Sequence, residues 1–127
     1  MNVVDSSGWL EFLADNPNAD AFAEPILKPE ILLVPVVSIY EVFKKVLLER
    51  DETTALQVVA LMMQGRLVDL DADLALSAAK LSIAQRLPMA DSLILSTARK
   101  YGATLWTQDE DFAGMEGVRY FPKAAAE

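Results

Sequence analysis

The sequence predicts a three-layer α/β fold, in which a central, mainly parallel sheet of four to five strands lies between two layers of helices. Three observations support this prediction. Short apolar segments alternate with amphipathic helical segments along the chain, the order that produces a parallel sheet. Residues 31–37 form an apolar run typical of a strand buried on both faces. No repeat or linker divides the chain, so we expect one domain, residues 1–127, with a flexible tail from about residue 123.

The expected elements follow from the spacing of apolar residues. Short apolar runs that end at polar residues indicate strands, and apolar residues that recur every three or four positions indicate helices. Strands are expected at residues 3–4, 31–37, 67–70, 104–107 and 118–121. Helices are expected at residues 9–13, 17–28, 38–50, 52–63, 72–85 and 90–101.

Proline, glycine and aspartate mark the ends of several elements. Pro35 cannot donate a hydrogen bond within a sheet, so we expect it near the C-terminal end of the second strand. Gly65 and Gly102 suit the ends of the helices that precede them. Asp71 suits the N-cap of the fifth helix, and Pro88 precedes the sixth.

The composition excludes several kinds of chemistry. The chain has no histidine and no cysteine, which rules out Ser-His-Asp and Cys-His catalysis, histidine-based cleavage of RNA, and thiolate metal sites. A metal held by side chains would need oxygen ligands, which favour Mg²⁺, Mn²⁺ or Ca²⁺. The net charge of −8 taken alone disfavours nucleic-acid binding, but a bound divalent cation would reverse the local field.

The sequence also predicts a location. The longest apolar stretch, residues 31–37, is far shorter than the roughly 20 residues of a membrane-spanning helix. Residues 1–5 lack the basic and apolar regions of a signal peptide. We therefore expect a cytoplasmic protein that does not associate with a membrane.

Carboxylates are expected to gather at one edge of the sheet. Asp5 ends the first strand, and Glu41 falls in the first turn of the helix after the second strand. Asp91 opens the helix before the fourth strand. Asp109 follows that strand closely, with Asp111 just behind. Functional sites of parallel α/β sheets lie beyond the carboxyl ends of the strands, so separate segments would bring these acids together.

Such a cluster suits metal-dependent hydrolysis. Carboxylates packed together raise one another's pKa, and a divalent cation removes that conflict. Mg²⁺ binds one or two carboxylates directly and keeps several waters, and Mn²⁺ is its expected substitute. The cation activates water and stabilises charge on a phosphoryl group, the two effects that hydrolysis of a phosphodiester needs. The expected catalytic residues are Asp5, Glu41, Asp91 and Asp109.

Each acid also has an alternative role that needs no metal. Asp5 would cap the turn at residues 6–8. Ser38 and Glu41 have the spacing of a capping box, with Ser38 at the N-cap. The remaining acids would be ordinary residues of a helix first turn or of a turn. Thr107, at the end of the fourth strand, is a candidate to orient a water or Asp5.

Other patterns indicate packing or solvated surface. Apolar residues recur at helical spacing within residues 56–63 and 75–83, which indicates a core or a subunit interface. Lys44, Lys45 and Arg50 have two interpretations, since they would either contact RNA phosphates or lie on solvated helix faces.

Several segments resemble the motifs of one known family. Residues 3–9, Val3-Val4-Asp5-Ser6-Ser7-Gly8-Trp9, resemble the opening of a PIN domain of the VapC toxin type. Residues 87–94, followed by Ala98, are similar to the third acidic motif of that family, and residues 105–112 resemble its fourth. Glu41 falls where the family's helix glutamate is expected. The resemblance covers essentially the whole chain.

This resemblance implies a PIN-like fold and a Mg²⁺-dependent endoribonuclease, usually a homodimer that a cognate antitoxin holds inactive. Asp5, Asp91 and Asp109 would be the metal ligands, and the first two would hold the metal most directly. Glu41 would complete the acidic pocket. The auxiliary residues would be Thr107 and Asp111.

Two other interpretations are compatible with the sequence. The chain could be a catalytically inactive PIN-like module that binds nucleic acid or protein. It could also be a receiver-like signalling domain, which uses strand-end acids with Mg²⁺ and needs an aspartate after its third strand and a lysine after its fifth. Asp71 could mimic that aspartate, but Lys123 lies late for the lysine.

Overall fold

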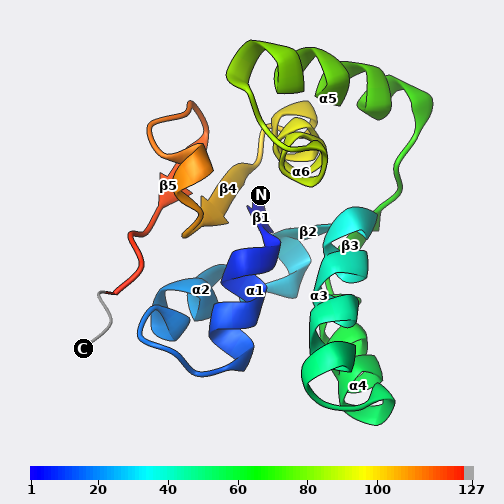
Figure 1. Ribbon diagram of the computed structural model, residues 1–127, viewed down its shortest axis with the longest axis vertical. Helices are drawn as coiled ribbons and strands as arrows, with labels where there is room; N and C mark the ends of the chain where they lie inside the picture. The colour runs from blue at the N-terminus through cyan, green and yellow to red at the C-terminus, as the bar shows by residue number, and fades with distance from the viewer. Residues whose placement is uncertain (125–127) are drawn as a thin grey trace.

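The computed structural model describes residues 1–124, and its centre is one sheet of five strands in the order β3-β2-β1-β4-β5 (Figure 1). Every pair of neighbouring strands is parallel, which confirms the predicted sheet. The strands are β1 (Asn2–Val4), β2 (Leu32–Pro35), β3 (Arg66–Val68), β4 (Thr104–Thr107) and β5 (Val118–Tyr120). The α-helices are α1 (Ser6–Leu13), α2 (Ala19–Ile26), α3 (Val36–Glu49), α4 (Glu52–Met62), α5 (Ala72–Gln85) and α6 (Met89–Lys100). Two 3₁₀-helices are η1 (Pro29–Ile31) and η2 (Glu110–Phe112).

Helices cover both faces of the sheet, so the three predicted layers are confirmed (Figure 1). Successive residues of a strand point to opposite faces, and the two hydrophobic cores follow this alternation. Val3 and Leu105 belong to the core formed with α5 and α6. Val4 and Trp106 belong to the core formed with α1 to α4. Burial on both faces explains why β2 is apolar and buried along its whole length.

The strand order places a switch point between β1 and β4. From β1 the chain moves outward through β2 to β3, and it then returns to the other side of β1 to form β4 and β5. Val4 pairs with Trp106, so β1 and β4 end side by side. Asp5 directly follows β1, and Gln108 and Asp109 directly follow β4. Polar residues therefore meet where parallel α/β sheets commonly bind ligands.

Pro35 lies at the C-terminal end of β2, which confirms its predicted place. The strand itself is shorter than the predicted 31–37, because β2 spans Leu32–Pro35. Pro35 has φ −63° and ψ 139°, an extended conformation, and α3 begins at the next residue, Val36. The capping box, considered as the alternative role of Ser38 and Glu41, is therefore excluded. Ser38 is buried inside α3, and its hydroxyl has no hydrogen-bond partner among the residues that the structure describes.

Helix α1 begins at Ser6, earlier than the predicted start at Trp9, because Asp5 caps it. The Asp5 carboxylate accepts a hydrogen bond from the Gly8 N–H at 3.0 Å, which satisfies one of the unpaired amides of the first turn. Gly8 also allows α1 to lie close to α2, since a Cβ there would lie 2.7 Å from the Phe22 ring. Asp5 thus sets the start of α1, and Gly8 allows this helix to pack closely against α2.

Two hydrogen bonds hold the segment that directly follows β5 and precedes the predicted tail. The Phe121 N–H donates to the Thr107 carbonyl at 2.8 Å, and the Asn18 side chain donates to the Pro122 carbonyl at 3.0 Å. Lys123 follows directly, without regular secondary structure. The rest of the predicted tail, residues 125–127, lies outside the described residues. Within residues 1–124, no helix is long and apolar enough to cross a membrane.

Candidate metal centre

Five carboxylates meet beyond the carboxyl ends of β1 and β4. They come from the N-cap of α1, from α3, from the first turn of α6, and from the start of η2. These residues are Asp5, Glu41, Asp91, Asp109 and Asp111. The charges of the other four all act on Asp91, so the acids form one electrostatic cluster. The structure thus brings together all the acids that the sequence nominates.

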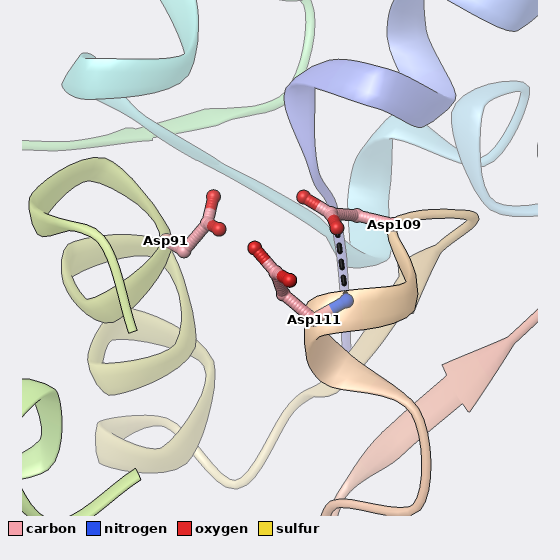
Figure 2. Close-up of side chains that lie close together, drawn as sticks. All are labelled: Asp91, Asp109 and Asp111. Carbon is pink, nitrogen blue, oxygen red and sulfur yellow. Dashed lines mark hydrogen bonds between the residues drawn. The ribbon is translucent and has the colours of Figure 1, made fainter. Parts of the chain in front are cut away.

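Three of these residues, Asp91, Asp109 and Asp111, form what we call the aspartate triad. One carboxylate oxygen of each lies within 4.8 Å of the others. Asp91 reaches from α6 toward the other two, which lie on the segment after β4 (Figure 2). The Asp111 N–H donates to Oδ1 of Asp109 at 3.0 Å, which fixes the turn that carries both side chains. The sequence favours Asp111 only as an auxiliary residue, but here it is an equal member of the triad.

Asp5 lies behind the triad and is only 3% exposed. Its Oδ1 accepts hydrogen bonds from the Gly8 N–H at 3.0 Å and the Ser7 hydroxyl at 2.8 Å. Its Oδ2 accepts one from the Thr107 hydroxyl at 2.7 Å. Thr107 in turn accepts from the Asp109 N–H at 2.9 Å. Asp5 is therefore a helix cap and also, through Thr107, a support for the turn that carries Asp109, while its role as a metal ligand stays a prediction.

Glu41 enters the cluster from α3. Because α3 begins at Val36, Glu41 lies beyond the first turn of this helix and cannot act as a capping-box residue. Its Oε1 instead accepts a hydrogen bond from the Ser6 hydroxyl at 2.6 Å. Sequence reasoning missed this contact, since the two residues lie 35 positions apart and no local pattern links them.

The cluster perturbs the ionisation of two of its members. Burial raises the pKa of Asp5 from its ordinary value of 3.8 to about 6, although the hydrogen bonds from Thr107, Ser7 and Gly8 oppose that rise. Burial also raises the pKa of Asp91, to about 7, and the negative charge of Asp109 is the next largest cause. At pH 7 a carboxyl with a pKa of about 7 is protonated about half of the time, and one with a pKa of about 6 is mainly ionised, so a bound cation would favour the fully ionised form of both.

The residues present fit a hard divalent cation. All available side-chain ligands in the cluster are carboxylate oxygens, the type that Mg²⁺ and Mn²⁺ prefer. Among the described residues, no hydrogen bond occupies the Asp91 carboxylate. Asp91 also lies in the first turn of α6, where the helix dipole favours negative charge. The aspartate triad could therefore hold a cation directly, with Asp5 and Glu41 fixed behind it.

The sequence comparison agrees with this fold and site. The family model of the PIN domain matches residues 3–118, so the chain belongs to the PIN domain family. No curated protein sequence matches the chain. The family resemblance stated from the motifs is thereby confirmed.

Solved structures share the fold. A toxin–antitoxin complex from Klebsiella pneumoniae contains a chain with a TM-score of 0.80 at 20% identity, covering 94% of this chain and 96% of that one. VapC20 of Mycobacterium tuberculosis, described as a sarcin–ricin loop cleaving toxin, has a TM-score of 0.75 at 19% identity, covering 94% of this chain and 99% of that one. DNA-bound VapBC from Salmonella typhimurium has a TM-score of 0.71 at 14% identity, covering 96% and 98%.

The raised pKa values predict how stability depends on pH. In the metal-free protein the folded state binds protons at Asp5 and Asp91 more tightly than the unfolded chain does. Their favourable contribution is complete below the ordinary pKa of 3.8 and is lost as the pH rises through about 6 and about 7. Asp91→Asn removes the Asp91 carboxyl, so the variant should not lose the stability that wild type loses when Asp91 ionises. In EDTA, its free energy of unfolding relative to wild type should increase from about pH 4 to about pH 8, as measured by urea denaturation.

A matched control is Asp73→Asn, which changes an exposed acid in the first turn of α5. Its difference from wild type should not follow the same rise. If Asp91→Asn changed the free energy of unfolding by the same amount at pH 4 and at pH 8, ionisation of Asp91 within the acidic cluster would be ruled out as the cause of the change.

Proposed function

We propose that this protein is a Mg²⁺-dependent endoribonuclease that hydrolyses RNA phosphodiester bonds and acts as the toxin of a toxin–antitoxin pair in the cytoplasm. The observation that carries the proposal is the convergence of five carboxylates, two with strongly raised pKa values, at the switch point of a PIN-domain sheet. Structural stability alone gives no reason to gather these charges. A cation and a phosphoryl group would make use of them.

Some residues of the centre would hold the cation, and the others orient the side chains that hold it. The aspartate triad would hold the cation, since its oxygens converge within 4.8 Å. Asp5 fixes the Asp109 turn through Thr107, and Ser6 fixes the Glu41 carboxylate. A bound Mg²⁺ supplies a more acidic water and stabilises charge on the phosphoryl group. Preorganised carboxylates of this kind cost little reorganisation during the reaction.

The comparisons support the choice of RNA and of a toxin. VapC20, which shares the fold, is described as cleaving the sarcin–ricin loop, and two other neighbours are toxin–antitoxin assemblies. The receiver-like alternative is excluded by membership of the PIN family. It also fails structurally, because β3 is an edge strand and the nearby Asp71 caps α5.

Metal dependence and the role of the triad can be tested together. We expect cleavage of RNA to stop in EDTA and to return with Mg²⁺ or Mn²⁺. Asp91→Asn and Asp109→Asn should each lower the rate at least about 100-fold, because they remove groups that act in the transition state. Asp73→Asn should keep wild-type activity, since that acid lies in the first turn of a different helix. The measurement is the initial rate on a labelled RNA.

Full activity in EDTA would refute the metal mechanism. A folded wild type that binds RNA or a partner without metal-dependent cleavage would favour the inactive binding module instead.

We also propose that the protein is a homodimer assembled through the groove between α5 and α6. Large apolar side chains are exposed there, with Ile83 83% and Met89 76% exposed. They line a groove of about 440 Å³ together with small residues such as Ala75 and Ala79. Burial of apolar surface of this kind is the main driving force for association.

Light scattering at micromolar concentration should therefore give twice the 13.9 kDa mass of the chain. Ile83→Asp should give the monomer mass, because it places a charge in the groove. Leu48→Asp, at an apolar residue on α3 that is 76% exposed, should leave the dimer intact. A monomeric wild type, or equal behaviour of the two variants, would count against this interface.

We further propose that an antitoxin inhibits the protein by placing an arginine or lysine among the acids of the centre. A guanidinium pairs bidentately with carboxylates and would compete with the cation for the same charge. The partner encoded beside this gene should thus bind more weakly as Mg²⁺ rises. Asp91→Asn should weaken it as well, by about 2–5 kcal/mol if the pair is desolvated. Calorimetric titration with and without Mg²⁺ measures both effects, and equal affinity throughout would mean that inhibition avoids the centre.

A further inference from the structure

A polar pocket of about 510 Å³ opens beside the candidate metal centre, between α1 and the end of β5. Two of its lining residues belong to the centre: Asp109 is a member of the aspartate triad, and Ser7 donates to Asp5. The pocket is therefore continuous with the acidic cluster. Its volume lies within the roughly 300–1,000 Å³ that is usual for small-ligand sites.

One side of the pocket is a buried amide held in a single orientation. Gln108 lines the pocket and is 5% exposed. Its Nε2 donates to Glu11 at 3.0 Å, and its Oε1 accepts from the Asn18 side chain at 3.1 Å. Burial opposes ionisation of Glu11, but hydrogen bonds from Asn18 and Gln108 hold the pKa of this carboxyl below its usual range. An ionised carboxylate only accepts hydrogen bonds, so the Gln108 amide cannot turn over.

Tyr120 and Lys123 also line the pocket, together with the acid Glu110. Tyr120 ends β5 and pairs in register with Thr107, so it reaches the same edge of the sheet as the acids. Lys123 lies two residues after Phe121, whose ring stacks on Trp106 with ring centroids 5.8 Å apart. The pocket thus combines an aromatic ring, an oriented amide and a cation next to a cluster of negative charge.

We propose that this pocket binds the nucleotide of single-stranded RNA that adjoins the phosphate held at the metal centre. The inference rests on the proposed ribonuclease function, because a chain cleaved at the triad must continue on either side of it. The Tyr120 ring would stack on the base, Gln108 would contact the base edge, and Lys123 would contact a phosphate. The polar lining of this pocket suits a nucleotide better than an apolar protein segment, whereas the apolar groove between α5 and α6 is the proposed homodimer interface.

The test compares pocket variants in two assays. In the first, each variant is combined with Asp91→Asn to prevent cleavage, and anisotropy measures binding of a labelled single-stranded RNA. Tyr120→Ala should weaken binding at least about five-fold, the lower bound for loss of one stacked base, while Tyr120→Phe should keep it. Lys123→Ala should weaken binding and reduce the slope of log affinity against log salt by about 0.7. Lys80→Ala, on the exposed face of α5, is the matched control and should change neither.

In the second assay, the same changes are made in the active protein with Mg²⁺. Tyr120→Ala and Lys123→Ala should raise KM with little change in kcat, since their contacts are made in the ground state as well as in the transition state. Thermal unfolding checks that each variant is folded. Lys123→Ala changes an exposed side chain, so it keeps the test decisive if Tyr120→Ala fails to fold.

The outcomes separate this inference from the proposed function. If wild type cleaves RNA with metal but both pocket variants match Lys80→Ala, the pocket is not the nucleotide site and the ribonuclease function stands. If the variants lose affinity only for the protein encoded beside this gene, the pocket is a protein-docking site and the inference is wrong. If wild type neither cleaves nor binds RNA, the inference and the proposed function both fail.

Discussion

The hydrogen bonds of Asp5 are the interaction on which the rest of the site depends. This carboxylate ends the central strand, is 3% exposed, and receives hydrogen bonds from Gly8, Ser7 and Thr107. The first of these bonds sets the start of α1. The last ties β1 to the end of β4, and Thr107 passes the constraint on to the Asp109 backbone. One buried side chain therefore positions a helix, the ends of two strands and the turn that carries the triad.

This arrangement has a cost that the fold must offset. The rise in the pKa of Asp5 from 3.8 to about 6 corresponds to about 3 kcal/mol against ionisation at neutral pH. Domains have only about 5–15 kcal/mol of net stability, so one such group consumes a substantial part of it. The cores on both faces of the sheet supply the compensating burial. A bound cation would recover part of the loss, because a ligand that binds only the folded state stabilises it.

The chain separates surfaces of different chemistry. The acids gather at the switch point, the polar pocket adjoins them, and the apolar groove lies between α5 and α6. This separation also bears on whether a protein with a net charge of −8 can bind a negatively charged substrate. Part of that charge is gathered where a cation would neutralise it, and Lys123 lies beside it at the mouth of the pocket. An acidic total charge is therefore compatible with a polyanionic substrate at this one place.

The alternation of apolar strands with amphipathic helices was sufficient, by itself, to predict the parallel three-layer fold, because each pattern has one favourable way to bury its apolar face. Strand ends also nominated the acids, since a carboxylate directly after a buried strand needs a partner. Contacts between distant residues required the tertiary structure. Ser6 binds Glu41 across 35 positions, and Asp111 joins the triad only because η2 turns it toward α6. The local pattern also allowed Ser38 a capping role, which the structure excludes, because the start of α3 is decided by how β2 ends against the sheet, which no short window of sequence contains.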